Sequence, residues 1–175
     1  EDNKTIPTVL PYINYYSGVS KFRGYNYDNR IEFYNIFRDK PTTIHSKEQR
    51  KFSYKFSIKK EIIRNGTLIN YGTEFYNQLF SVEDKRINNE SISNTYFRSF
   101  PIFGIDFQTP FKFKKNYSNL TYVPKLQFVV SPGSSNTEKI SNEDSSVNSY
   151  TIINNLNLNR YTGNDKLDNS KRINL

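Results

Sequence analysis

The stretch that decides the fold is residues 51–59, which read Lys-Phe-Ser-Tyr-Lys-Phe-Ser-Ile-Lys. Successive side chains of an extended strand point to opposite faces, so this stretch predicts a strand with two very different faces. One face carries Phe52, Tyr54, Phe56 and Ile58, and the other carries Lys51, Ser53, Lys55, Ser57 and Lys59. A strand with this pattern separates an apolar medium from water.

The composition fits a sheet with such unequal faces. Only 35% of the 175 residues are hydrophobic and 24% are charged, and the mean hydropathy is -0.78, values that are typical of disorder. The 14 Tyr and 14 Phe argue against disorder, because disordered segments are poor in aromatic residues. The chain has no Cys, which excludes disulfides and thiolate metal sites. No run approaches the roughly 20 apolar residues of a spanning helix, and no signal peptide is visible at Glu1.

The net charge of +8 is a feature that nucleic-acid-binding proteins share. The basic residues are nevertheless spread along the chain and are densest at residues 47–60 and 112–115. Neither a recognition-helix pattern nor an RNP-type motif is present. We therefore expect no nucleic-acid partner, and we assign most of the lysines to a solvated strand face.

Period-two alternation recurs along the chain, whereas helical periodicity is almost absent. The alternation predicts about eight long strands among nine runs, which are residues 6–16, 30–38, 50–63, 67–80, 94–107, 109–115, 120–130, 147–158 and 168–175. Asn65-Gly66 predicts a tight hairpin, because both residues tolerate a positive φ. The polar stretches 81–93 and 132–146 are predicted to be loops.

Strand length favours a membrane protein over a soluble one. Several runs span 10 to 14 residues before a breaker, whereas soluble strands usually have about 5–6 residues and a strand that crosses a bilayer needs roughly 9–11. A Lys on the lipid face at mid-bilayer costs about 2–4 kcal/mol, so the lysines are expected to face a watery lumen and the rings to face lipid. A soluble sandwich with its rings inward satisfies the same alternation, so the alternation alone leaves both architectures open.

The last third of the chain carries more specific motifs. Its ordered features are Pro124, then Asn142-Glu143-Asp144-Ser145, then Asn155-Leu156, then Asn159-Arg160-Tyr161-Thr162-Gly163-Asn164-Asp165, and finally Arg172. Upstream, residues 98–110 have the spacing of an Arg…Pro…Gly…Pro strand pair. This order resembles the β-barrel portion of the LptD family of outer-membrane lipopolysaccharide-assembly proteins, over about residues 96–175. Lys166 and Leu158 depart from the family pattern.

The resemblance implies that residues 1–175 form a single region, an internal part of a larger barrel. The expected fold is all-β, an antiparallel up-and-down transmembrane β-barrel segment that is incomplete. The implied function is insertion of lipopolysaccharide into the outer leaflet of the Gram-negative outer membrane, with no enzymatic activity and no cofactor. The implied partners are lipopolysaccharide, membrane lipid, an outer-membrane lipoprotein plug (LptE-like) and a periplasmic bridge protein (LptA-like).

Five lysines are the candidate lumen-facing substrate path: Lys51, Lys55, Lys59, Lys112 and Lys114. They would form a cationic wall beside the path of an anionic glycolipid, although lysines that merely solvate the lumen would follow the same pattern.

The motif residues are expected to be structural. Glu143 and Asp144 are expected in an extracellular or periplasmic turn, with a Ca²⁺ loop as the alternative. Asp165 is expected between the cations of Arg160 and Arg172, and Gly163 at a turn or a close strand approach. The lone His45 is assigned no role, and no catalytic set or metal site is predicted.

Two rival functions remain open from the sequence. A generic porin-like outer-membrane transporter barrel would show the same strands, with the motifs as coincidence. A soluble all-β carbohydrate-binding or adhesion module would bury its rings and stay monomeric without detergent.

Overall fold

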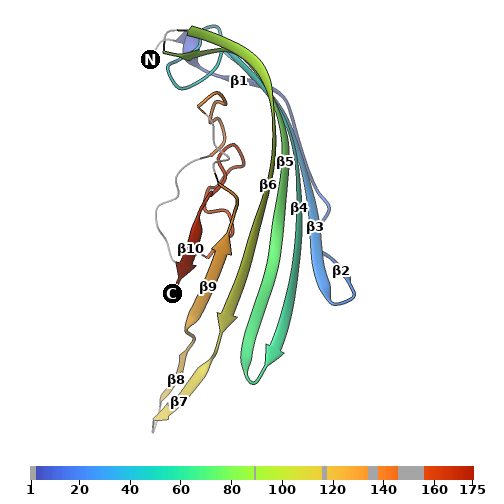
Figure 1. The fold of residues 1–175 in the computed structure, drawn as a ribbon, viewed down its shortest axis with the longest axis vertical. Coiled ribbons are helices and arrows are strands. Elements are labelled where there is room, and N and C mark those ends of the chain that lie inside the picture. The colour runs from blue at the N-terminus through green and yellow to red at the C-terminus, as the bar shows by residue number, and fades with distance from the viewer. Residues whose placement is uncertain (1–2, 89, 116–117, 134–137, 146–155) are drawn as a thin grey trace.

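The computed structural model describes residues 3–88, 90–115, 118–133, 138–145 and 156–175, and it consists of a long, curved antiparallel sheet (Figure 1). After a short 3-10 turn, η1 (Asn3–Thr5), the sheet contains β1 (Thr8–Tyr16), β2 (Ser20–Phe22), β3 (Tyr25–Phe37), β4 (Glu48–Arg64), β5 (Thr67–Ile87), β6 (Glu90–Gln108), β9 (Lys125–Val130) and β10 (Lys171–Asn174). The strand order is β1-β3-β4-β5-β6-β9-β10, and β2 pairs with β3. A separate hairpin consists of β7 (Phe111–Lys115) and β8 (Ser118–Tyr122).

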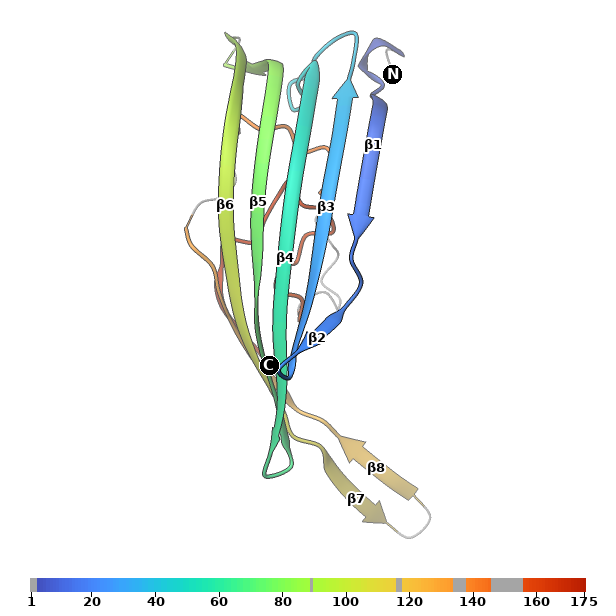
Figure 2. The same cartoon turned by 90° about the vertical axis from the view of Figure 1, so that its right-hand side faces the viewer.

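The predicted all-β antiparallel fold of about eight strands is confirmed, and the sheet is not closed into a barrel. Figure 2 shows β1 as one outer strand, and within the described residues β10 forms the opposite edge of the strand order. Among the described residues, no helix has both the length and the apolar character needed to cross a membrane.

The predicted loop at residues 81–93 is wrong. β5 runs to Ile87 and β6 begins at Glu90, and the two strands pair almost to the turn between them. A register shift between Val82 and Lys85 interrupts the alternation, and Asp84 has a positive φ of 50°. The irregular backbone hides the strand from a period-two reading, because a bulge displaces the side chains that follow it.

Two further strand predictions need correction. The run 120–130 is divided between β8 and β9, because the chain leaves the sheet at Val123-Pro124 and Pro has no N–H for a ladder. Most of the predicted strand 147–158 lies outside the described residues, and its last three residues are not in a strand. The Asn65-Gly66 hairpin is confirmed, with positive φ at both residues and β4 paired to β5 from Arg64↔Thr67 onward.

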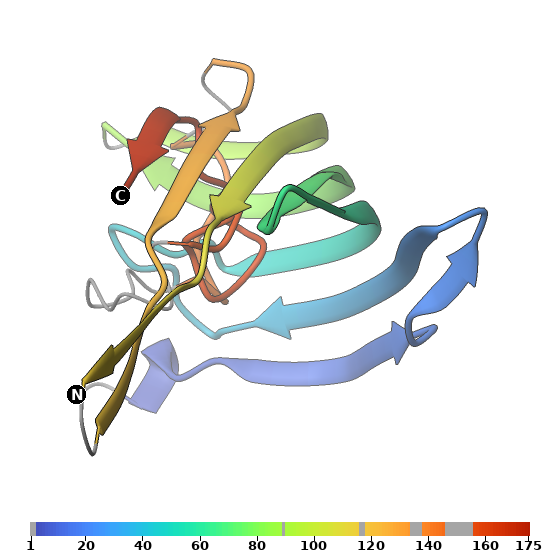
Figure 3. The same cartoon turned by 90° about the horizontal axis from the view of Figure 1, so that it is seen from below.

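The two faces of the sheet differ as residues 51–59 predicted. The convex face exposes rings, with Phe52 47% and Phe97 71% exposed. The concave face is covered by residues 138–145 and 156–170, here called the C-terminal segment, which lies inside the curve of the sheet in Figures 1 and 3. A small apolar core of Tyr76, Phe100, Ile102, Val129 and Leu167, with Leu158 against it, joins this segment to the sheet.

Candidate functional site

The concave face holds a buried ionic centre around Lys51, whose side chain has no exposed area. The Lys51 ammonium lies 3.0 Å from Glu32 of β3 and 2.7 Å from both Asp144 and Asp165 of the C-terminal segment. The ammonium also lies 5.0 Å from the centre of the Tyr34 ring. Lys51 therefore fastens the C-terminal segment to the sheet, because a buried ammonium requires charged partners.

Asp144 and Asp165 bind each other's backbone as well as Lys51. The backbone N–H of Asp165 donates to Asp144 Oδ1 at 2.7 Å, and the backbone N–H of Asp144 donates to Asp165 Oδ2 at 3.1 Å. Tyr34 adds a third kind of donor, because its hydroxyl donates to Asp165 Oδ2 at 2.9 Å. Three kinds of donor thus converge on two carboxylates, an arrangement that fixes the loop in one geometry.

The two carboxyl groups have opposite pKa shifts. Burial raises the pKa of Asp165 to about 6, against the opposing effect of the Lys51 ammonium. Burial also acts to raise the pKa of Asp144, but Lys51 and the hydrogen bonds that Asp144 accepts outweigh it and hold the pKa below its ordinary value. Both groups are therefore mainly ionised at neutral pH, as the ion pairs with Lys51 require.

A second anchor lies on the next two strands of the sheet, β5 and β6. Arg98 of β6 donates to the carbonyl oxygens of Asn164 (2.7 Å) and Asp165 (2.9 Å). Gln78 of β5 accepts from Arg98 Nε at 2.8 Å and donates to the same Asn164 carbonyl at 2.9 Å. Arg98 and Gln78 thus satisfy backbone carbonyls of the C-terminal segment that would otherwise be buried without donors.

Glu143 forms the third anchor, at a position where an extracellular or periplasmic turn was expected. Its carboxylate makes a two-point contact with Arg38, at 2.5 and 3.1 Å, and its side chain is almost fully buried. His45, to which the sequence gave no role, lies with Nδ1 at 3.2 Å from Glu143 Oε1. Within the described ranges, no group of three or more acidic, His or Cys side chains is arranged to hold a metal ion. Glu143 and Asp144 are already engaged by Arg38 and Lys51.

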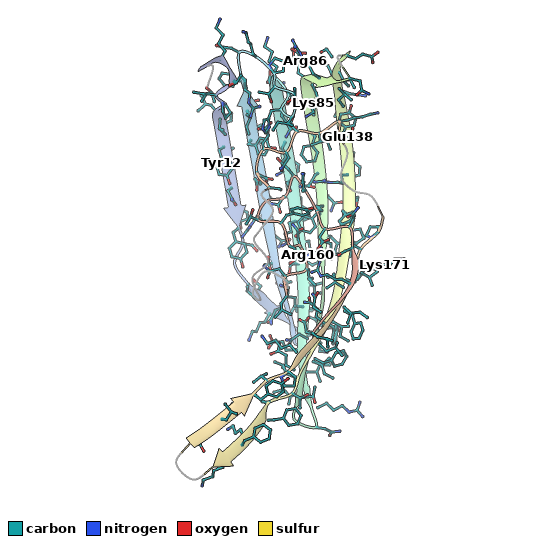
Figure 4. The ribbon with its side chains drawn as sticks, turned by 90° about the vertical axis from the view of Figure 1, so that its left-hand side faces the viewer. Tyr12, Lys85, Arg86, Glu138, Arg160 and Lys171 are labelled. Atoms are coloured by element: carbon teal, nitrogen blue, oxygen red, sulfur yellow. The ribbon has the colours of Figure 1, made fainter. Side chains whose placement is uncertain are left out.

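The predicted pairing of Asp165 with two arginines is also corrected. Asp168, rather than Asp165, lies between the cations, with Arg160 Nε at 2.6 Å and an ion pair to Arg172 Nη1. Figure 4 shows Arg160 on the C-terminal segment in front of the strands. The sequence pointed to Asp165 because it stands close to Arg160, but the structure commits Asp165 to Lys51.

Gly163 lies at a close approach, as the sequence predicted. A Cβ at this position would lie 2.4 Å from the backbone oxygen of Asp144. Gly104 is a second close approach, because a Cβ there would lie 2.2 Å from Leu158 Cδ2. Gly163 lets the two stretches of the C-terminal segment pack against each other, and Gly104 lets Leu158 of the segment pack against β6.

The remaining motif residues support the segment locally. The Asn142 side chain donates to the carbonyl of Ser145 and accepts from the backbone N–H of Ser145. Ser145 Oγ accepts from the backbone N–H of Lys166 at 2.9 Å. Asn159 donates to the carbonyl of Gly163 at 3.2 Å. The Leu156 carbonyl accepts from Gln127, and the Pro124 carbonyl accepts from Thr109. Asn155 lies outside the described residues.

A polar cleft of about 400 Å³ lies between the sheet and the C-terminal segment. Lys55 and Lys59 line it from β4, and Tyr161 lines it from the C-terminal segment. Glu74 of β5 holds Lys55 at 3.0 Å and lies 3.8 Å from Lys59, whose side chain is half-exposed. Of the five candidate lysines, these two present cationic side chains to a space that a ligand could occupy.

The other three candidate lysines lie elsewhere. Lys51 is on the expected face, but it is buried and neutralised by three carboxylates, so its charge is not presented to a ligand. Lys112 and Lys114 lie on the separate β7–β8 hairpin and not on the concave face of the sheet. The same alternating pattern therefore carries a buried lysine, two lysines that line the cleft and two lysines on the separate hairpin.

Sequence reasoning missed most of the partners of the ionic centre. They are Glu32, Tyr34, Arg38, Gln49, Gln78 and Asp168. Strand parity was the available signal, because Glu32 and Tyr34 alternate with the ring of Phe33 along β3 and so share the face that bears Lys51. Arg38 continues this parity directly after the last residue of β3. The sequence alone did not indicate that a distant segment would cover this face.

Comparison with known proteins gives one family. A family model described as "LptD: LPS transport system D" matches residues 1–175, which is the whole of the chain. A search of the curated proteins finds no match.

Proposed function

The chain belongs to the LptD family of lipopolysaccharide-transport proteins, and we propose from this premise that it forms part of the outer-membrane translocon barrel. In this role the translocon barrel inserts lipopolysaccharide into the outer leaflet, and residues 1–175 are an internal part of the barrel domain. The family acts in transport and assembly and is not a family of enzymes. The proposed partners are lipopolysaccharide, membrane lipid, a lipoprotein plug (LptE-like) and a periplasmic bridge protein (LptA-like).

The observation that carries the proposal is the inverted burial of the sheet. Buried positions on the concave face include Lys51, Gln78 and Arg98, whereas rings such as Phe52 and Phe97 are exposed on the convex face. A soluble protein gains free energy by burying its rings, about 25 cal/mol per Å² of apolar surface. The exposed rings of the convex face contribute this free energy only if an apolar medium covers them, and lipid tails supply such a medium.

The height of the apolar band on β4 supports the same placement. Along the convex face, Arg50 and Lys60 bracket Phe52, Tyr54, Phe56 and Ile58. The two cations are ten positions apart, which is roughly 33 Å along a strand. At the usual barrel tilt of about 35–45°, this length rises roughly 25 Å, which matches the apolar band of outer-membrane barrels. Polar side chains inside the band pair with each other, as Ser99 does with Asn77 at 2.8 Å.

The rival functions fit these observations less well. A soluble carbohydrate-binding module would pack its rings into a core, whereas the described core on the concave side is small. A generic porin-like barrel accounts for the inverted burial but not for the family match over the whole chain.

The cleft beside Lys55 and Lys59 is the proposed contact with the glycolipid. Its two ammonium groups lie next to Glu74, so their net charge is reduced and an anionic group would be held reversibly. Tyr161 and Leu158 line the same cleft from the C-terminal segment. The cleft is too small for the whole lipopolysaccharide molecule and suits one phosphate or sugar group of the core.

Removal of both charges tests this site. We expect Lys55→Gln with Lys59→Gln to lower the amount of lipopolysaccharide at the cell surface per folded barrel. The amount of folded barrel in the outer membrane is measured alongside, because Glu74 loses both of its cationic partners. Lys21→Gln is the matched control, because Lys21 is an exposed lysine on β2, away from the cleft. A normal amount of surface lipopolysaccharide in the double variant would show that the cleft is not a contact site for the glycolipid.

A further inference from the structure

The β7–β8 hairpin has one apolar face with no cover. Its register pairs Phe111 with Tyr122 and Phe113 with Leu120, which places the four side chains on one face. All four are exposed, Phe113 by 55% and Leu120 by 65%. This is the inverted pattern of the sheet repeated on a short hairpin that stands apart from it (Figure 2).

The opposite face of the hairpin is cationic. Lys112 pairs with Thr121 and Lys114 pairs with Asn119 across this face, and both lysine side chains are exposed. Residues 107–137 contain four Lys and neither Asp nor Glu. A surface of this kind attracts anions, because no neighbouring carboxylate in the sequence offsets the ammonium charge.

The hairpin lies at the end of the sheet where β4 turns into β5. Figures 1 and 3 show it projecting past that end, on the side of the concave face. The chain between β9 and β10, residues 131–170, is the longest stretch between two strands of the sheet and leaves from the opposite end, as do the connections 38–47 and 88–89. The hairpin end holds the two-residue turns Arg23-Gly24 and Asn65-Gly66 and the β7–β8 hairpin itself. Outer-membrane barrels have their longest loops on the extracellular side, so in the proposed placement the end that 131–170 leaves from is extracellular and the hairpin end is periplasmic.

We propose that the β7–β8 hairpin is a receiving surface for the phosphorylated, acylated end of the glycolipid as it reaches the periplasmic mouth of the barrel. Acyl chains pack on the face formed by Phe111, Phe113, Leu120 and Tyr122. Phosphate groups bind Lys112 and Lys114, whose long side chains reach round a hairpin only two strands wide. The inference rests on the proposed function, because it takes lipopolysaccharide as the substrate of the same barrel.

Site-specific photo-crosslinking in living cells tests the inference. A benzoylphenylalanine is placed at Phe113 on the hairpin or at Tyr161 in the cleft, in the complete outer-membrane protein, and captured molecules are identified by their lipopolysaccharide content. We expect both positions to capture lipopolysaccharide. Capture of a protein, of phospholipid alone or of nothing at Phe113, with capture at Tyr161 intact, would overturn the hairpin site and leave the proposed function standing. Loss of capture at both positions would overturn both.

Charge variants test the role of the lysines. We expect Lys112→Gln with Lys114→Gln to reduce capture at Phe113 on the order of tenfold, because two cations near an anionic lipid are removed. Lys112→Arg with Lys114→Arg keeps the charge and should retain capture. Lys21→Gln is the control for loss of one exposed lysine. Equal capture in the Gln and wild-type forms would show that the lysines do not bind the phosphate groups, and the hairpin proposal would then fail.

Discussion

Lys51 is the single residue on which the attachment of the C-terminal segment most depends. Removal of one partner of a buried ion pair costs about 3–5 kcal/mol, because the other charge stays buried without compensation. Lys51→Met leaves Glu32, Asp144 and Asp165 in that condition. We expect a large drop in the denaturant midpoint of unfolding, measured in detergent micelles. Lys59→Met is the matched control and should shift the midpoint little. The Lys59 side chain is half-exposed, and its ammonium lies 3.8 Å from Glu74, a longer and weaker ion pair than those of Lys51. Equal shifts in the two variants would contradict this role of Lys51.

At the residue scale, the sequence determined which way a side chain points but not what it meets. Parity placed Lys51 opposite Phe52 correctly, and the structure keeps them on opposite faces. The partners Asp144 and Asp165 lie more than 90 positions further along the chain. No local pattern carries that contact, because two-residue periodicity describes one strand and not the segment that later covers it.

The C-terminal segment is the element whose packing is most sensitive to small changes. A Cβ at Gly163 would meet the backbone of Asp144, which has no flexible end that could move aside. We expect Gly163→Ala to cost about 1–3 kcal/mol through overpacking. Limited proteolysis of the folded protein should then cut the segment faster than in the wild type.

The matched control for this prediction is Gly133→Ala, because no atom lies within 4 Å of a Cβ at Gly133. Its rate of cutting should equal that of the wild type. A Gly163→Ala variant that resists cutting as the wild type does would mean that the Asp144 loop moves aside at no cost.

At the element scale, strands were predictable where alternation is unbroken. β4 and the Asn65-Gly66 turn follow from residues 50–67 almost alone. β5 and β6 were cut short in prediction because the register shift between Val82 and Lys85 breaks the period. The acidic motif at residues 143–144 was expected in an extracellular or periplasmic turn because charged residues are seldom buried, and only its partners Arg38 and Lys51 explain why it is buried.

The described part of the chain is an open curved sheet that buries charged side chains such as Lys51 and Arg98 on its concave face and exposes rings such as Phe52 and Phe97 on its convex face. Neither β1 nor β10 has a second strand neighbour within the described residues. Unpaired backbone groups at such edges are costly in hydrocarbon. The proposed placement therefore requires further strands beside both edges in the assembled barrel, a requirement that strand alternation does not reveal.

The two sides of β6 give the sharpest test of this arrangement. Phe97 is 71% exposed on the convex face, and Phe100 is 3% exposed on the concave face. The two residues lie on the same strand and are the same residue type, so they form a matched pair. We expect a benzoylphenylalanine at Phe97 to crosslink to phospholipid or lipid acyl chains in the native outer membrane, because the proposed placement puts the convex face against the bilayer. The same group at Phe100 should crosslink within the chain, because the C-terminal segment covers the concave face. Lipid capture at Phe100 but not at Phe97 would show that the concave face, and not the convex face, meets lipid. Lipid capture at neither position would contradict the proposed placement of the sheet in the membrane.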